Sequence, residues 1–293
     1  MISDIFFQIA LTAYTGYLAY IGLVPVGTIE ATGALNGVIF TALGNFTSQI
    51  SSISSIRPIF DKYKKYIQLD SDMREFDNQN NHEEIYQIKN LTFSYGNKNI
   101  FDNLNYTFLR NKKYLLIGDS GSGKSTLLKL MFGYLTTYKG DIYFNKELVT
   151  ENNYVNIRNH VLYINQEAYL FNDTIRNNIN LDDNYEDEKI LGVLNELGMP
   201  LSIKDLDMNV GDRGANISGG QRQRIVLARG LIRNQKIIFI DEGTSAVDKL
   251  ASVQIERMLL QRKDLTVILV THNVHEETKN LFDYTLYFPE SLK

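Results

Sequence analysis

The sequence predicts an α/β fold built on a parallel sheet with a phosphate-binding loop, preceded by an all-α hairpin that crosses a membrane. Three observations predict it. No Lys or Arg occurs before Arg57. From residue 85 onward, short apolar runs alternate with segments that have a helical pattern. One of these runs, Lys113–Ile117, leads into a loop with the spacing G-x-x-x-x-G-K-S and then into a helix.

Length and composition limit the number of domains and the classes of site that the chain can contain. The 293 residues suggest about two domains. The absence of cysteine excludes a disulfide scaffold, a thiolate zinc site and a cysteine nucleophile. A formal net charge of -4 gives no support for a broad nucleic-acid-binding surface, so no nucleic acid is expected as a partner.

Residues 1–69 are predicted to form a partial transmembrane domain with spans at about 5–24 and 31–54. Asp4 and Glu30 are the only charged residues up to position 56. As a helix, the run Phe6–Val24 would be about 28 Å long, close to the thickness of a bilayer core. The second segment is more polar, which suits a helix packed against others or lining an aqueous path. A buried soluble hairpin is the alternative.

The hairpin also predicts an orientation. Pro25 and Gly27 break the two segments apart and form a turn. Basic residues begin with Arg57 directly after the second segment, and the positive-inside rule makes that end cytoplasmic. Residues 70–84 are polar and acidic, which is typical of a linker. The remaining residues, 85–293, are predicted to form a nucleotide-binding domain.

The glycine-rich loop is the strongest phosphate-binding signal in the chain. Its glycines let backbone N–H groups and a helix N-terminus point at an anion. Lys124 is expected to reach the β- and γ-phosphates of ATP, and the Ser125 hydroxyl to bind Mg²⁺. The predicted ATP-binding loop consists of Gly118, Asp119, Ser120, Gly121, Ser122, Gly123, Lys124, Ser125 and Thr126.

A second apolar strand, Lys236–Ile240, ends in two acidic residues. An acid at the carboxyl end of a buried strand beside such a loop is suited to bind Mg²⁺, partly through water, and Asp241 takes that role. Glu242 is then placed to polarise the attacking water as the general base. The alternative is that the acidic pair only caps the strand.

A second anion-binding helix end lies before the predicted helix Ile225–Ile232. It consists of Ser218, Gly219, Gly220 and Gln221. Ser and Gly at a helix start expose backbone N–H groups, and the helix dipole favours negative charge there. One chain with two phosphate-binding ends suggests ATP sites that are shared across a dimer.

With these motifs, residues 85–293 resemble the ATP-binding cassette (ABC) transporter family. The run ISGGQ is similar to the family signature LSGGQ. The resemblance implies a P-loop NTPase fold of the RecA-like kind, with an antiparallel β subdomain and a helical signature subdomain. It also implies that Tyr95 stacks on adenine, that Gln166 contacts ATP and its Mg²⁺, and that Asp248 belongs to the D-loop.

The resemblance makes His272 the switch histidine. It would bond the γ-phosphate and hold Glu242 and the water in register without being the base itself. The other histidines, His82, His160 and His275, have no such context and are expected at the surface. Catalysis is therefore assigned to Glu242, His272 and Lys124.

The segment Asn209–Gly214 resembles one found in ABC exporters, and the hairpin resembles the last two of an exporter's six spanning helices. The resemblance implies an ATP-binding and hydrolysing subunit or fragment of an exporter, as a truncated or fragmentary gene product. It would be multi-pass in a bacterial plasma membrane, with the ATPase domain cytoplasmic. Its partner would be a second copy, another half-transporter or a membrane subunit. A transport-incompetent ATPase with a regulatory role or none, and a non-transport ABC ATPase, are the alternatives.

Overall fold

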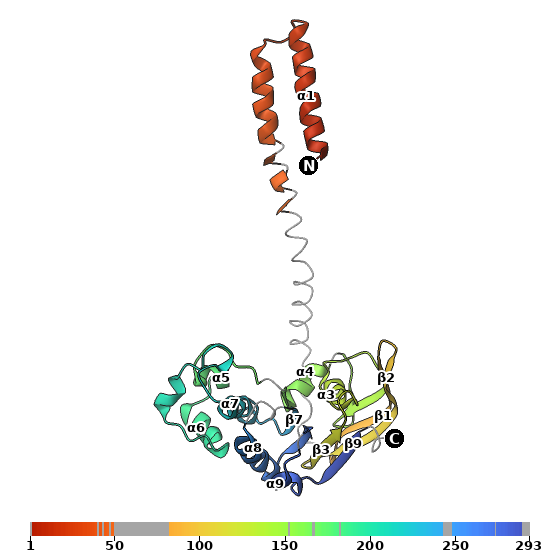
Figure 1. Ribbon diagram of the computed structural model, residues 1–293, viewed down its shortest axis with the longest axis vertical. Helices are drawn as coiled ribbons and strands as arrows, with labels where there is room; N and C mark the ends of the chain where they lie inside the picture. Colours follow the sequence, from red (N-terminus) through yellow and green to blue (C-terminus); the bar gives the residue numbers. More distant parts are fainter. Residues whose placement is uncertain are drawn as a thin grey trace. The chain divides into compact units, whose positions relative to one another are not determined.

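The computed structural model describes residues 2–49 except 40, 43 and 47, and residues 82–288 except 152, 166–167, 182, 243–247 and 273. The chain divides into two compact units, Met1–Ser71 and Asp72–Lys293 (Figure 1). Most of the predicted linker, 70–84, lies outside the described residues, as does the end of the second predicted span.

The first unit is a helical hairpin. Helix α1 covers Ile2–Tyr20, and residues 27–39 form the next described helical stretch. Gly22, at φ +76°, lies in the turn between them. Large apolar side chains such as Leu23 and Val38 are exposed. Within the described residues, no helix is both long enough and apolar enough to span a membrane. The two predicted spans stay predictions.

The second unit contains a four-stranded antiparallel sheet in the order β2-β1-β4-β5. The strands are β1 (Glu84–Tyr95), β2 (Lys98–Leu109), β4 (Lys139–Phe144) and β5 (Glu147–Leu148). Strands β1 and β2 form a hairpin in which Tyr95 pairs with Lys98 across a two-residue turn. Gly96 in that turn has φ +55°, a conformation that glycine adopts without steric cost.

A five-stranded sheet of parallel pairs, in the order β6-β7-β8-β3-β9, forms the centre of this unit. Its strands are β6 (Val161–Ile164), β7 (Ile237–Asp241), β8 (Thr266–Val270), β3 (Lys113–Gly118) and β9 (Tyr284–Phe288). Every residue of β7 and β8 is buried, as expected for strands covered on both faces. The predicted strands at 113–117 and 266–270 are confirmed, and the strand predicted at 236–240 is found one residue later, at 237–241.

The helices of this unit fall on the two sides of the parallel sheet (Figure 1). They are α3 (Lys124–Phe132), α4 (Tyr154–His160), α5 (Ile175–Asn180), α6 (Asp187–Glu196), α7 (Gly219–Ile232), α8 (Lys249–Gln261) and α9 (Glu276–Lys279), with 3₁₀ turns η1 (Ile203–Asp207) and η2 (Asp212–Gly214). Alternate strand residues divide between two cores. Leu116 and Phe239 join the antiparallel sheet and α3, while Leu115 and Ile238 join the helical subdomain. The predicted α/β fold, with its antiparallel and helical subdomains, is confirmed.

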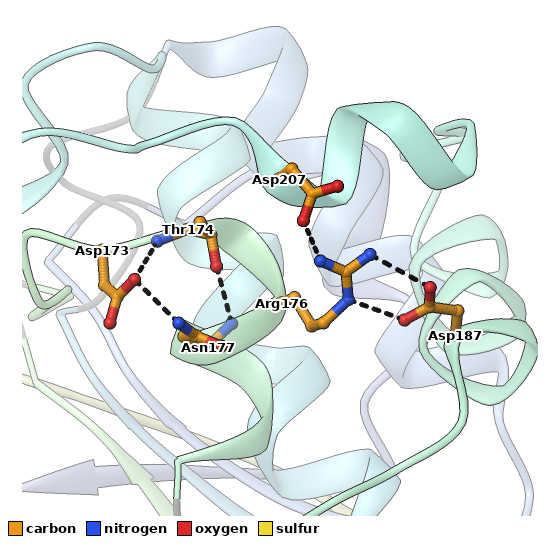
Figure 2. Close-up of polar contacts among 6 residues, drawn as sticks. All are labelled: Asp173, Thr174, Arg176, Asn177, Asp187 and Asp207. Carbon is orange, nitrogen blue, oxygen red and sulfur yellow. Dashed lines mark hydrogen bonds and ion pairs between the residues drawn. The ribbon is translucent and has the colours of Figure 1, made fainter.

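An ion-pair network holds the helical subdomain together (Figure 2). Arg176 of α5 makes a bidentate pair with Asp187 of α6, with Nε–Oδ1 at 2.7 Å and Nη2–Oδ2 at 3.0 Å. Its third nitrogen donates to Asp207 of η1. Thr174 caps the same helix by accepting from the Asn177 backbone N–H at 3.1 Å. One guanidinium therefore connects α5, α6 and η1.

We expect Arg176→Met to lower the melting temperature at neutral pH. The hydrogen bonds from Arg176 lower the pKa of Asp187. A depressed carboxylate pKa stabilises the folded state above the unfolded-state pKa, and this stability is lost as the pH falls through the folded-state value. The difference from wild type should therefore shrink below about pH 4. Arg257→Met, at an exposed position on α8, is the control; an equal effect there would contradict the network's role.

Candidate functional site

The glycine-rich loop connects the carboxyl end of β3 to the start of α3. Gly123, the N-cap of α3, has φ +105°. A Cβ at this position would lie 2.8 Å from Ile100 Cγ2 and 2.9 Å from Phe101 Cε1. The loop therefore requires glycine here for both its conformation and its close approach to the β1–β2 hairpin. The strand–loop–helix context that the motif needs is present.

Lys124 is the first residue of α3, and its ammonium is folded back over the backbone of the loop. Nζ donates to the carbonyl oxygens of Gly118 at 2.7 Å and Asp119 at 2.8 Å, and to Ser122 Oγ at 3.2 Å. Burial lowers the pKa of Lys124, while the nearby carboxylates, Glu242 first, act in the opposite direction. The loop thus holds the Lys124 ammonium close to its own backbone. This positive charge suits the loop to bind an anion.

Asp241, the last residue of β7, is bonded by two hydroxyl groups. Ser125 Oγ donates to Oδ1 at 2.5 Å, and the Tyr163 hydroxyl donates to Oδ2 at 2.8 Å. Burial, and then the charge of Asp241, raises the pKa of Tyr163, so this hydroxyl remains a donor. The carboxylate is fixed from both sides, with one oxygen directed at the first turn of α3.

Glu242 and His272 meet at the carboxyl edge of the parallel sheet. His272 Nε2 lies 2.6 Å from Glu242 Oε1, and both side chains are partly exposed. Glu242 has φ +54°, an unusual conformation for a residue with a side chain. Its N–H donates to the carbonyl of Val270 at 2.9 Å, which links the end of β7 to the end of β8. Backbone strain at such a position is typical of a functional site.

The remaining predicted residues of the nucleotide site lie on separate elements. Tyr95 ends β1, is 48 % exposed and contacts Phe93 edge to face at 4.9 Å between ring centroids. That geometry suits a ring that stacks on a base. Asp248 caps α8 by accepting from the Ala251 N–H at 3.0 Å. Gln166 lies outside the described residues.

The signature residues form a capping box at the start of α7. Ser218 Oγ accepts from the Gln221 N–H at 3.2 Å, and Gln221 Oε1 accepts from the Ser218 N–H at 2.9 Å. Gly219 and Gly220 are the first two residues of the helix. Among the described residues, neither Ser218 nor Gln221 has a hydrogen bond to the glycine-rich loop. The structure therefore brings together the loop, Asp241, Glu242 and His272, and within the described residues it shows no hydrogen bond from this helix end to that group.

Sequence reasoning missed Tyr163 and was wrong about His275. Tyr163 is on β6, and only the adjacency of β6 and β7 brings it to Asp241. His275 was expected at the surface, but its side chain is 13 % exposed and its Nδ1 lies 2.9 Å from Glu256 Oε1. Thr278 Oγ1 donates to the other oxygen of Glu256 at 2.7 Å. A carboxylate on the apolar face of α8 was the available signal for this pair, in which Glu256 is buried and His275 is partly buried.

Comparisons with known proteins agree with the motifs. The model of the ABC transporter family matches residues 101–245. The chain is 28 % identical over 292 residues to the ATP-dependent lipid A-core flippase of Mannheimia succiniciproducens, covering 93 % of this chain and 50 % of that protein. It is 37 % identical over 194 residues to the microcin-J25 export ATP-binding/permease protein McjD of Escherichia coli, covering 64 % and 33 %.

A solved structure described as a bacterial Atm1-family ABC exporter with ATP bound is similar in fold. The TM-score is 0.64 at 22 % identity, over 98 % of this chain and 52 % of that one. The chain thus spans about half the length, or less, of the relatives that it matches. By its motifs, its fold and the matched domain, the chain belongs to the ABC transporter family.

Proposed function

We propose that this chain is the ATP-binding and hydrolysing part of an ABC exporter, in which ATP-driven association of two nucleotide-binding units is coupled to export. The single observation that carries the proposal is the 2.6 Å pairing of His272 with Glu242. It lies on the same sheet edge as the loop that holds Lys124. The family itself implies ATP binding, and the relatives named above include a flippase and an export protein.

In this mechanism the loop binds the triphosphate and the sheet edge activates water. Backbone N–H groups of the loop and the start of α3 hold the phosphates, and Lys124 exchanges its carbonyl partners for phosphate oxygens. The water oxygen attacks the γ-phosphorus, the bond from that phosphorus to the β–γ bridging oxygen breaks, and Glu242 accepts the water's proton. His272 keeps Glu242 aligned. This is phosphoryl transfer to water and needs no covalent intermediate.

Ser125 and Asp241 fit a Mg²⁺ ion. A hydroxyl and a carboxylate oxygen 2.5 Å apart are hard oxygen ligands, which Mg²⁺ prefers together with phosphate oxygens. Within the described residues, no three His, Cys, Asp or Glu side chains gather to form a metal cage. A bound Mg²⁺ would neutralise charge on the phosphates. Gln166, the third predicted ligand, belongs to this proposal by resemblance alone.

Tyr163→Phe tests the setting of Asp241. Removing one hydroxyl donor lets the carboxylate turn away from Ser125, so we expect the Mg²⁺ concentration for half-maximal ATP hydrolysis to rise about fivefold. Tyr134→Phe is the matched control, because Tyr134 packs on the Tyr163 ring with centroids 5.4 Å apart. A Mg²⁺ titration that is the same for Tyr163→Phe and wild type would contradict this role.

The second phosphate-binding end defines the partner. Ser218 is exposed and heads α7, so its helix end is available to an ATP bound on another chain. We propose that two copies associate head to tail, each ATP lying between the loop of one and Ser218–Gln221 of the other. Alternatively, a related half-transporter or a membrane subunit takes the place of the second copy. The membrane would be the bacterial plasma membrane, with the hairpin in the bilayer and the ATPase unit in the cytoplasm.

Purified full-length chain incorporated into phospholipid vesicles tests the proposed function. We expect phosphate release that saturates with ATP, and a chain that stays with the vesicles after an alkaline wash. The wash separates integral from peripheral association. A chain that binds ATP but releases no phosphate would contradict the enzyme, and a chain recovered in the wash would contradict the membrane hairpin.

A further inference from the structure

The ammonium of Lys98 lies over the glycine-rich loop. Its Nζ is 3.7 Å from the position that a Cβ on Gly121 would take. Gly121 itself has φ +76° and lies in the middle of the loop, two residues before Gly123. Lys98 belongs to β2 in the antiparallel sheet and to none of the motifs described above. A side chain from another subdomain therefore brings a second positive charge to the phosphate-binding loop.

The β1–β2 hairpin fixes Lys98 in this place. Lys98 is the first residue of β2, and Ile100 follows two positions later on the same face of the strand. Ile100 and Phe101 approach Gly123 so closely that no side chain fits there. The strand is thus packed against the loop immediately beyond Lys98, which places this lysine beside the loop.

The same hairpin carries the predicted adenine-stacking residue. Tyr95 and Lys98 are cross-strand partners on the two sides of the Gly96 turn. A nucleotide with its base on Tyr95 and its phosphates in the loop would pass Lys98 on the way. Within the part of the chain that the structure describes, the Lys98 ammonium forms no ion pair or hydrogen bond, whereas the Lys124 ammonium forms three.

We propose that Lys98 is a further phosphate-binding residue: its ammonium binds a phosphate oxygen of the nucleotide above Gly121, opposite Lys124. The ligands that it selects are nucleoside di- and triphosphates, because an ammonium adds affinity for an anion and none for the uncharged nucleoside. This inference rests on the proposed function, since it needs a nucleotide in the loop. It assigns part of the recognition to the antiparallel sheet as well as to the P-loop motif.

The test is equilibrium binding of ATP, ADP and adenosine to the full-length chain carrying Lys98→Met. We expect ATP and ADP to bind about tenfold more weakly, because a charge-assisted hydrogen bond is lost, while adenosine binding is unchanged. Lys98→Arg should restore most of the affinity. The difference between wild type and Lys98→Met should shrink as salt is raised, since the site is exposed. Lys139→Met, an exposed lysine on β4 of the same sheet, is the matched control.

The outcomes separate this inference from the proposed function. Unchanged ATP affinity in Lys98→Met, with binding abolished in Lys124→Ala, would overturn the role of Lys98 and leave the ATP site standing. Equal weakening of ATP and adenosine would overturn the phosphate assignment, because it would report a distorted hairpin. Wild-type chain that binds no ATP at all would overturn the proposed function as well.

Discussion

Glu242→Gln lowers the rate of phosphate release by about 10²-fold or more, because a general base contributes at least that much to proton transfer. The amide keeps the size of the side chain and a hydrogen bond to His272, but it cannot accept a proton from water. ATP binding should change little, since the loop and Lys124 are untouched. The measurement is steady-state phosphate release beside equilibrium binding of ATP, on the same preparation of full-length chain.

The matched control for this change is Glu276→Gln. Glu276 lies on α9, four residues beyond His272, and its side chain is 80 % exposed. It should leave turnover at the wild-type level. A Glu242→Gln chain that keeps full turnover would remove Glu242 from the role of base, whatever its distance from His272. A chain that loses ATP binding together with turnover would make Glu242 a binding residue.

Ser218→Arg is expected to leave ATP binding by one chain nearly intact and to lower turnover about 10²-fold, the cost of losing an electrostatic contact to the reacting group. The bulky cation takes the position where the second chain's ATP would approach. Because the Ser218 hydroxyl bonds only the Gln221 N–H among the described contacts, its replacement should leave the loop of the same chain undisturbed. Sedimentation with and without ATP measures association beside turnover.

Ser202→Arg controls for the lost helix cap. Ser202 and Asp205 form the same kind of capping box at the start of η1, with Asp205 Oδ2 accepting from the Ser202 N–H at 2.8 Å and from Oγ at 2.7 Å. Ser202→Arg should lower the free energy of unfolding about as much as Ser218→Arg does, but it should leave ATP-driven association unchanged. ATP-driven dimers that survive Ser218→Arg would refute the shared site. Equal loss in both variants would trace the effect to stability.

Local patterns predicted those parts of the fold and site that neighbouring residues determine. The apolar runs and the spacing of the glycine-rich loop specify strand, loop and helix through Lys124 and Ser125, because loop geometry depends on adjacent residues. Local patterns were not enough to predict the pairing of Glu242 with His272. It spans thirty positions and depends on β7 lying beside β8, which the family resemblance supplied and periodicity alone did not.

Contacts between distant elements were beyond the sequence. Tyr163 reaches Asp241 because β6 is the edge strand next to β7, and strand order leaves no local trace. His275 was assigned to the surface because no motif surrounds it, and its partner, Glu256, is nineteen residues earlier on α8. Lys98 matches no motif, and only the packing of β2 against the loop reveals it. In each case the missing information was the arrangement of elements, not their type.

If each ATP is hydrolysed between two copies of this chain, two differently inactivated variants should complement each other. Lys124→Ala disables the loop of its own chain, and Ser218→Arg disables the helix end of its own chain. In a mixed dimer, one site combines the intact loop of the Ser218→Arg chain with the intact helix end of the Lys124→Ala chain. We predict that mixing the two inactive variants restores phosphate release well above either alone. A mixture no more active than the sum of its parts would contradict the shared site.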